Sequence, residues 1–95
     1  MIAIGLMSGT SLDGVDAALV EIKDEKFKLL KFITHRYDEK FKSRLMRNLH
    51  DSTAKLSEIC SLNFELGYKF LDAINELLAG TIYTYADIAF VASHG

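Results

Sequence analysis

The stretch best suited to chemistry runs from residue 5 to residue 16 and reads GLMSGTSLDGVD. Two of its three glycines, Gly9 and Gly14, leave the backbone bare, so that a phosphate can approach main-chain N–H groups directly. The hydroxyls of Thr10 and Ser11 add donors between them. Carboxylates follow at residues 13 and 16, and magnesium accepts carboxylate oxygens, directly or through water. The stretch predicts an ATP–magnesium site, although a plain hairpin turn rich in small residues has the same composition.

Other motifs with this glycine spacing fit less well. Gly9 and Gly14 are spaced as in a Walker A loop, but Val15 and Asp16 stand where that loop requires lysine and then serine or threonine. A nucleophile elbow would need a second glycine at the position of Asp13. The three histidines lie far apart in the sequence and show no metal-ligand spacing.

Apolar runs on both sides of this stretch predict strands that position it. Residues 1–7, 15–22 and 27–37 have the length and composition of strands, and the connections between them are short. Short connections favour an antiparallel meander. The first run shows no alternation of apolar and polar residues, which predicts a strand that is buried on both faces.

The hydrophobic period then changes to that of helices. Phe41, Leu45 and Leu49 lie four residues apart, so they share one helix face, and Asp38 is a plausible N-cap. A second, longer helix is predicted from caps at residues 51–53 to about residue 79, with a glycine as its stop signal. Its apolar stripe consists of Leu56, Ile59, Cys60, Asn63, Leu66, Gly67, Phe70, Ile74, Leu77 and Leu78.

Within this long helix, Gly67 predicts close packing against a neighbouring element, and Cys60 is read as a small core residue. Residues 87–93 form a fourth apolar run, and a strand reached through a helix is usually parallel to its neighbour. The expected fold is therefore α/β, with a mixed sheet and the element order β-β-β-α-α-β.

Composition limits the classes of partner and compartment. The formal net charge is −2, which gives no reason to expect nucleic acid or an acidic membrane as a partner. The single cysteine excludes an internal disulfide, and no apolar run approaches the roughly 20 residues that span a bilayer. We expect a cytoplasmic protein. The run Ala92-Ser93-His94-Gly95 follows an apolar strand abruptly, so residues 1–95 are expected to be one truncated part of a larger lobe.

The run from Gly5 to Leu19 closely resembles the opening signature of anhydro-N-acetylmuramic acid kinases. Residues 62–67 resemble the long helix of that family, and residues 92–95 resemble the end of its next strand. The resemblance thus extends over the whole chain. It implies an actin-like (ribonuclease H-like) ATPase fold of two lobes, in which a β-hairpin with a glycine–hydroxyl tip holds the phosphates of ATP.

The resemblance also implies an activity and a set of site residues. The family uses ATP to phosphorylate 1,6-anhydro-N-acetylmuramic acid, and it opens the anhydro ring with water to give N-acetylmuramic acid 6-phosphate during cell-wall recycling. The nucleotide-binding residues carried over are Gly9, Thr10, Ser11, Leu12, Asp13, Gly14, Val15 and Asp16. Asp13 or Asp16 would orient Mg²⁺, and His94 is a weaker candidate for contact with the sugar.

The resemblance places the catalytic base beyond residue 95, so the isolated chain is expected to be inactive. It is also expected to self-associate through apolar surface, and a homo-oligomer is an open possibility. Two alternatives to the sugar kinase stay open from the residues alone. One is another actin-like ATPase, chaperone-like or regulatory, although those relatives usually carry an aspartate near the first glycine, where Met7 and Ser8 stand here. The other is a small α/β module without catalysis.

Overall fold

The chain forms a four-stranded mixed sheet with two helices in the computed structural model, which describes residues 1–8, 13–47 and 56–94, with the side chains of residues 56–64 and 94 excepted. The strands are β1 (Ile2–Ser8), β2 (Gly14–Lys23), β3 (Lys26–Arg36) and β4 (Ile88–His94). The helices are α1 (Glu39–Arg47) and α2 (Leu56–Leu78), and a short 3₁₀ turn (Tyr85–Asp87) precedes β4. This confirms the predicted element order.

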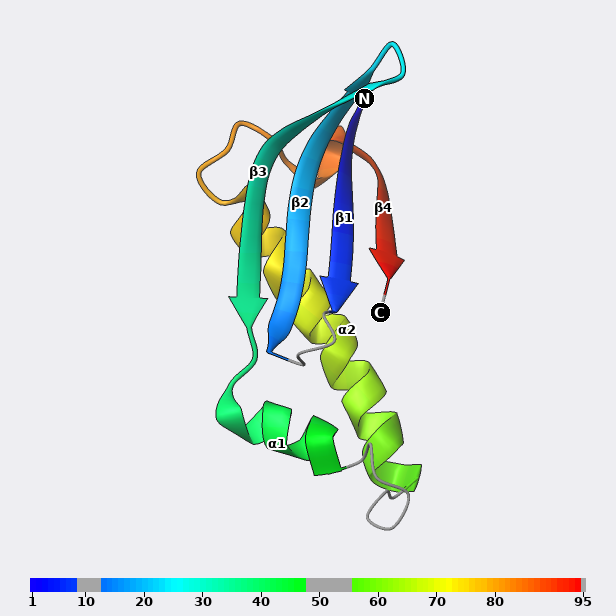
Figure 1. Ribbon diagram of the computed structural model, residues 1–95, viewed down its shortest axis with the longest axis vertical. Coiled ribbons are helices and arrows are strands. Elements are labelled where there is room, and N and C mark those ends of the chain that lie inside the picture. Colours follow the sequence, from blue (N-terminus) through cyan, green and yellow to red (C-terminus); the bar gives the residue numbers. More distant parts are fainter. Residues whose placement is uncertain (9–12, 48–55, 95) are drawn as a thin grey trace.

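The sheet has the order β3-β2-β1-β4 (Figure 1). β1, β2 and β3 pair antiparallel as the predicted meander, and β4 pairs parallel with β1, as expected for a strand that follows a helix. The turn between β2 and β3 places Asp24 and Glu25 at positive φ (52° and 64°), the backbone geometry of a tight hairpin turn. The carboxyl ends of β1 and β4 lie at the same end of the sheet.

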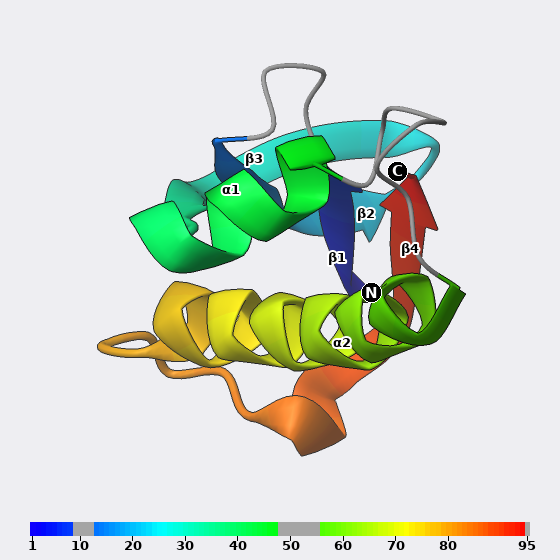
Figure 2. The ribbon, with the colours of Figure 1, turned by 90° about the horizontal axis from the view of Figure 1, so that it is seen from below.

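Helix α2 forms a second layer against one face of the sheet, and α1 lies across the end of the sheet where β1 and β3 finish (Figure 2). The core between these layers consists of Ile4, Leu6, Val15, Ala17, Leu19, Tyr37, Phe41, Ala73, Leu77 and Leu78. The apolar stripe predicted for the long helix is confirmed at five of its described members, which are buried or pack against this core: Leu66, Phe70, Ile74, Leu77 and Leu78. Gly67 is exposed. Leu56, Ile59, Cys60 and Asn63 belong to the positions whose side chains are not described.

Both helix ends that lie within the described residues are closed as the sequence predicts. Asp38 Oδ1 accepts a hydrogen bond from the Phe41 amide at 2.7 Å, which makes Asp38 the N-cap of α1. Gly80 follows α2 with φ 76°, the left-handed conformation that ends many helices. Lys31 on β3 donates to the Ala79 carbonyl at 2.8 Å, so a cation from the sheet also satisfies the last turn of α2. The caps predicted at residues 51–53, and Leu49, lie outside the described residues.

Two packing predictions were wrong. The first strand is not buried on both faces, because Met7 is 51% exposed on the face away from α2. No described element covers that face at the carboxyl end of β1 (Figure 2). Gly67 does not mark a close approach, since a Cβ built there would find open space. Among the described residues, no helix is both long and apolar enough to cross a membrane.

Candidate functional site

The predicted phosphate-binding stretch connects β1 to β2, and both of its ends are held by the sheet. Ser8 ends β1 opposite Val15, and the antiparallel ladder continues from that pair. Of the predicted nucleotide-binding residues, Gly9, Thr10, Ser11 and Leu12 lie outside the described part of the chain. Asp13, Gly14, Val15 and Asp16 are described. The structure therefore describes the two legs of the hairpin, the end of β1 and the start of β2.

Gly14 lies at a close approach of β2 and β3. A Cβ at this position would lie 2.4 Å from the carbonyl oxygen of His35 and 2.9 Å from Cα of Arg36. Both contacts are with backbone, which cannot turn aside as a flexible side chain can. The glycine is thus required for the approach of two strands, a role separate from the phosphate approach that its type suggested.

Val15 directs its side chain into the core and is fully buried. Only its backbone faces the hairpin, and that backbone pairs with Ser8 on one side and with His35 on the other. Val15 can therefore contribute to a site only indirectly, by fixing the base of the hairpin through its buried side chain and its paired backbone.

Asp13 is fastened to the segment that follows β3. Its carbonyl accepts the amide of Tyr37 at 2.8 Å, and its carboxylate pairs with the Lys42 ammonium of α1 at 2.5 Å. The hydrogen bond to Asp13, with its negative charge, raises the pKa of Lys42. Tyr37 in turn has its hydroxyl 3.2 Å from the hydroxyl of Ser8. Both legs of the hairpin are thereby tied to one segment, and these two anchors, Tyr37 and Lys42, were missed at the sequence level.

Asp16 lies on the opposite face of β2 from Val15. It is paired with Met7 on β1 and with Thr34 on β3. The Thr34 hydroxyl donates to Asp16 Oδ1 at 2.7 Å. In the described part of the chain no lysine or arginine pairs with this carboxylate, and it stays partly exposed. Asp13 and Asp16 are only three residues apart, but their carboxylates have different partners: the Lys42 ammonium and the Thr34 hydroxyl.

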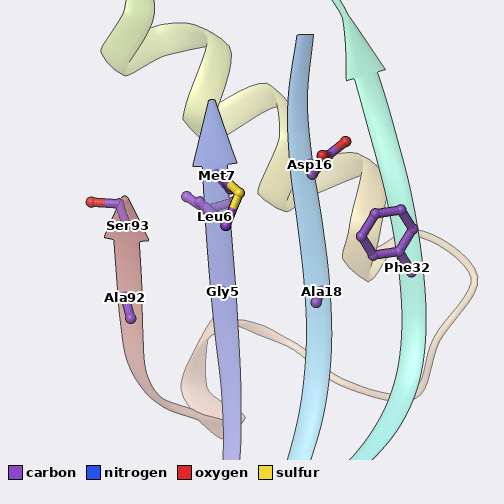
Figure 3. A pocket seen from close by; sticks show the side chains of 8 residues that line it. All are labelled: Gly5, Leu6, Met7, Asp16, Ala18, Phe32, Ala92 and Ser93. Carbon is purple, nitrogen blue, oxygen red and sulfur yellow. The ribbon is translucent and has the colours of Figure 1, made fainter. Parts of the chain in front are cut away.

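A hollow opens beside Asp16 on the face of the sheet that α2 does not cover, with a volume of about 380 Å³ (Figure 3). Its lining is mostly apolar and comes from all four strands: Gly5, Leu6, Met7, Asp16, Ala18, Phe32, Ala92 and Ser93. Asp16 and Ala18 on β2, and Gly5 and Met7 on β1, alternate along their strands, so period-two counting would have found these four. Leu6 belongs to the core and does not follow this period. The contribution of Phe32 and Ser93 depends on the strand order and carried no local signal.

His94 ends β4 and lies opposite Met7 in the parallel register. Its backbone is therefore at the same end of the sheet as the hairpin, beside the hollow. The structure does not describe its side chain, so its predicted sugar contact stays a prediction.

The donors available for a cation are oxygens. Among the described residues no group of three or more histidine, cysteine, aspartate or glutamate side chains comes together. One carboxylate with a neighbouring hydroxyl fits a cation that keeps most of its waters and is shared with a phosphate, which is the usual manner of magnesium.

Comparison with known proteins gives a consistent result over the full sequence. The sequence model of the family described as anhydro-N-acetylmuramic acid kinase matches residues 1–95. A protein of that name from Francisella tularensis subsp. novicida is 41% identical over 97% of this chain, and one from Clostridioides difficile is 39% identical over 100%. One from Bacillus cereus strain Q1 is 38% identical over 100%. The chain spans about a quarter of the length of these relatives (25%, 26% and 26%).

Proposed function

Because this chain belongs to the anhydro-N-acetylmuramic acid kinase family, we propose that it supplies the phosphate-binding hairpin of an ATP-dependent kinase that acts on 1,6-anhydro-N-acetylmuramic acid. The observation that carries the proposal is the family match over residues 1–95, together with a glycine- and hydroxyl-rich connection held between two paired strands. Each of the relatives named above is called a kinase of this sugar, which favours this reading over another actin-like ATPase or a non-catalytic module.

We propose that the sheet belongs to one lobe of an actin-like ATPase. The antiparallel meander followed by a parallel strand, with the hairpin and the end of β4 at one end of the sheet, supports this assignment. Nucleotide and sugar would then meet at that end. The cytoplasmic location and the homo-oligomer named in the sequence analysis stay predictions.

In this mechanism the hairpin positions ATP. Main-chain amides and the hydroxyls of Thr10 and Ser11 would hold the β- and γ-phosphates, with bare backbone at Gly9 admitting them. Asp13 or Asp16 would orient Mg²⁺, which when bound neutralises phosphate charge. Phosphoryl transfer depends mainly on positioning and charge stabilisation. A hairpin whose base is fixed in the sheet would contribute the positioning.

The sugar chemistry uses groups that this chain does not supply. A base from the remaining part of the kinase would take a proton from water, and the water oxygen would bond to the anhydro carbon as the ring C–O bond breaks. The freed sugar oxygen would accept the γ-phosphoryl group, which leaves ADP and N-acetylmuramic acid 6-phosphate. His94, if it contacts the sugar, would do so from the end of β4.

The test is a chimera in which these 95 residues replace the matching quarter of the Francisella relative. We expect turnover of the anhydro-sugar by the chimera and none by the isolated chain. Gly9→Val in the chimera should abolish ATP binding, because its branched side chain would occupy the space of a phosphate. A well-folded chimera without turnover would remove the kinase assignment, and unchanged ATP affinity in the Gly9→Val chimera would remove the role of the hairpin.

A further inference from the structure

Asp13 and Asp16 have different charge environments, although both are equal candidates for orienting magnesium when the sequence alone is considered. The Asp13 carboxylate is paired with Lys42 at 2.5 Å, so its charge is already balanced. Within the described residues, the one hydrogen bond or ion pair of the Asp16 carboxylate is with the neutral Thr34 hydroxyl. A cation gains more from a carboxylate whose charge no neighbour has balanced.

We infer that Asp16, held in place by Thr34, is the carboxylate that orients the magnesium of bound ATP. The ion pair between Asp13 and Lys42 has a structural role and holds the base of the hairpin against α1. This inference rests on the proposed function. It assigns Thr34 as a positioning residue, which acts only through Asp16.

Thr34 suits this role because of its place and its geometry. It is directly opposite Asp16 in the β2–β3 register, so the two side chains stand on the same face of the sheet. A β-branched side chain has few rotamers in a strand, which fixes the direction of its hydroxyl. The bond of 2.7 Å occupies Oδ1 and leaves Oδ2 with its acceptor capacity for a cation or its water.

The surroundings of Asp16 also fit a shared cation. Figure 3 shows Asp16 at the rim of the hollow, in front of β2 and between Met7 and Phe32. Apolar side chains flank the carboxylate, and a charge beside such low-dielectric groups attracts a cation more strongly than a charge in open water. Ser93 on β4 also lines the hollow, but its hydroxyl points away from Asp16 in Figure 3, so Asp16 is the carboxylate of this lining.

Asp13 and Lys42 lie elsewhere and neither lines this hollow. Their ion pair links the base of the hairpin to α1, next to the backbone bond between Tyr37 and Asp13. For Asp13 to bind a cation, Lys42 would first have to leave. The arrangement therefore favours a mechanical role for this pair.

The test measures ATP affinity of the chimera by calorimetry, with Mg²⁺ and with a chelator. We expect Thr34→Val to reduce the magnesium-dependent gain in affinity about tenfold, as loss of an outer-shell partner usually does, and Asp16→Asn to reduce it at least as much. Affinity in chelator should not change. Thr34→Ser, which keeps the hydroxyl but lacks the β-branch, should keep most of the gain. Asp13→Asn and Lys42→Met should keep the gain and lower thermal stability.

Two results would overturn the inference: loss of the magnesium-dependent gain in Asp13→Asn but not in Asp16→Asn, or equal effects of Thr34→Ser and Thr34→Val. If the parent chimera binds no ATP, the proposed function fails, and the inference is then decided on the 95-residue chain with MnCl₂ alone. Paramagnetic broadening of amide signals should centre on Asp16, Met7 and Ser93 and disappear in Asp16→Asn. Broadening centred on Asp13, or spread evenly over the acidic surface, would overturn it.

Discussion

Replacing Gly14 by alanine should destabilise the fold before it affects any ligand. The added Cβ would lie 2.4 Å from the His35 carbonyl oxygen, whereas ordinary contacts begin at 3.4 Å, so the strands would have to separate by about 1.0 Å (3.4 − 2.4). That displacement also pulls on the adjacent bond from the Tyr37 amide to the Asp13 carbonyl. Forcing extra volume into a packed site typically costs about 1–3 kcal/mol.

We expect the loss to be about 2 kcal/mol, or a fall of roughly 8–16 °C in melting temperature for a domain of this size. The assay is urea unfolding of the 95-residue chain followed by circular dichroism, with a thermal scan as a second measure. Gly5→Ala in β1 is the matched control, because its Cβ would meet no atom within 4 Å. Removal of a strand glycine there should raise stability by about 0.5–1 kcal/mol.

A Gly14→Ala chain as stable as the Gly5→Ala chain would refute the reasoning. It would mean that β2 and β3 are not as close as the structure places them, and that Gly14 serves only the phosphate. A destabilised Gly14→Ala chain with a normal Gly5→Ala control would instead assign the glycine to the contact between the strands.

Three other predictions concern the turn, the helix cap and the open face. Glu25→Gly should stabilise the chain by about 1 kcal/mol in thermal melts, because glycine adopts the observed φ of 64° without strain. Asp38→Ala should lower the melting temperature by about 4–8 °C through loss of the N-cap. The Phe41 amide lowers the pKa of Asp38 below its ordinary 3.8, so the stability that the carboxylate adds is present above pH 3.8 and is lost as the pH falls through the lowered value. A wild-type advantage that did not shrink as the pH fell below 3.8 would contradict this. Phe32→Ser should weaken self-association about tenfold in sedimentation velocity, whereas Ile82→Ser, equally apolar but away from the hollow, should not.

The elements that the sequence predicted well are those with local signals. The three-residue and four-residue spacing of Phe70, Ile74 and Leu77 defines a helix face without reference to any other element. Asp38 and Gly80 mark helix ends through interactions within one turn. Short connections left the first three strands little choice but to pair in order. Each of these features depends on residues that are close along the chain.

The features that escaped prediction depend on tertiary contacts. Met7 was expected to be buried because its neighbours are apolar, but burial requires a covering element, and no described element lies there. Gly67 was read as a contact because it shares a stripe with apolar residues. The ties from Tyr37 and Lys42 to the hairpin span 24 and 29 residues (37 − 13 and 42 − 13), a separation over which composition gives no signal. The candidate site was predicted from its residue types, and the contacts that anchor its two ends became visible only in the structure.

The parallel pairing of β1 with β4 has a consequence for the order in which the chain folds. Ile2 pairs with Ile88 across 86 residues (88 − 2), whereas Lys23 and Lys26 pair across three. Because loop closure over long separations is slow, we expect the meander to form early and the β1–β4 pairing to set the folding rate. Until then β1 is an unpaired edge, the state in which a nascent chain would be open to wrong strand partners. Pulse-labelled hydrogen exchange should show late protection in β4, and equal early protection in β4 and β2 would contradict this order.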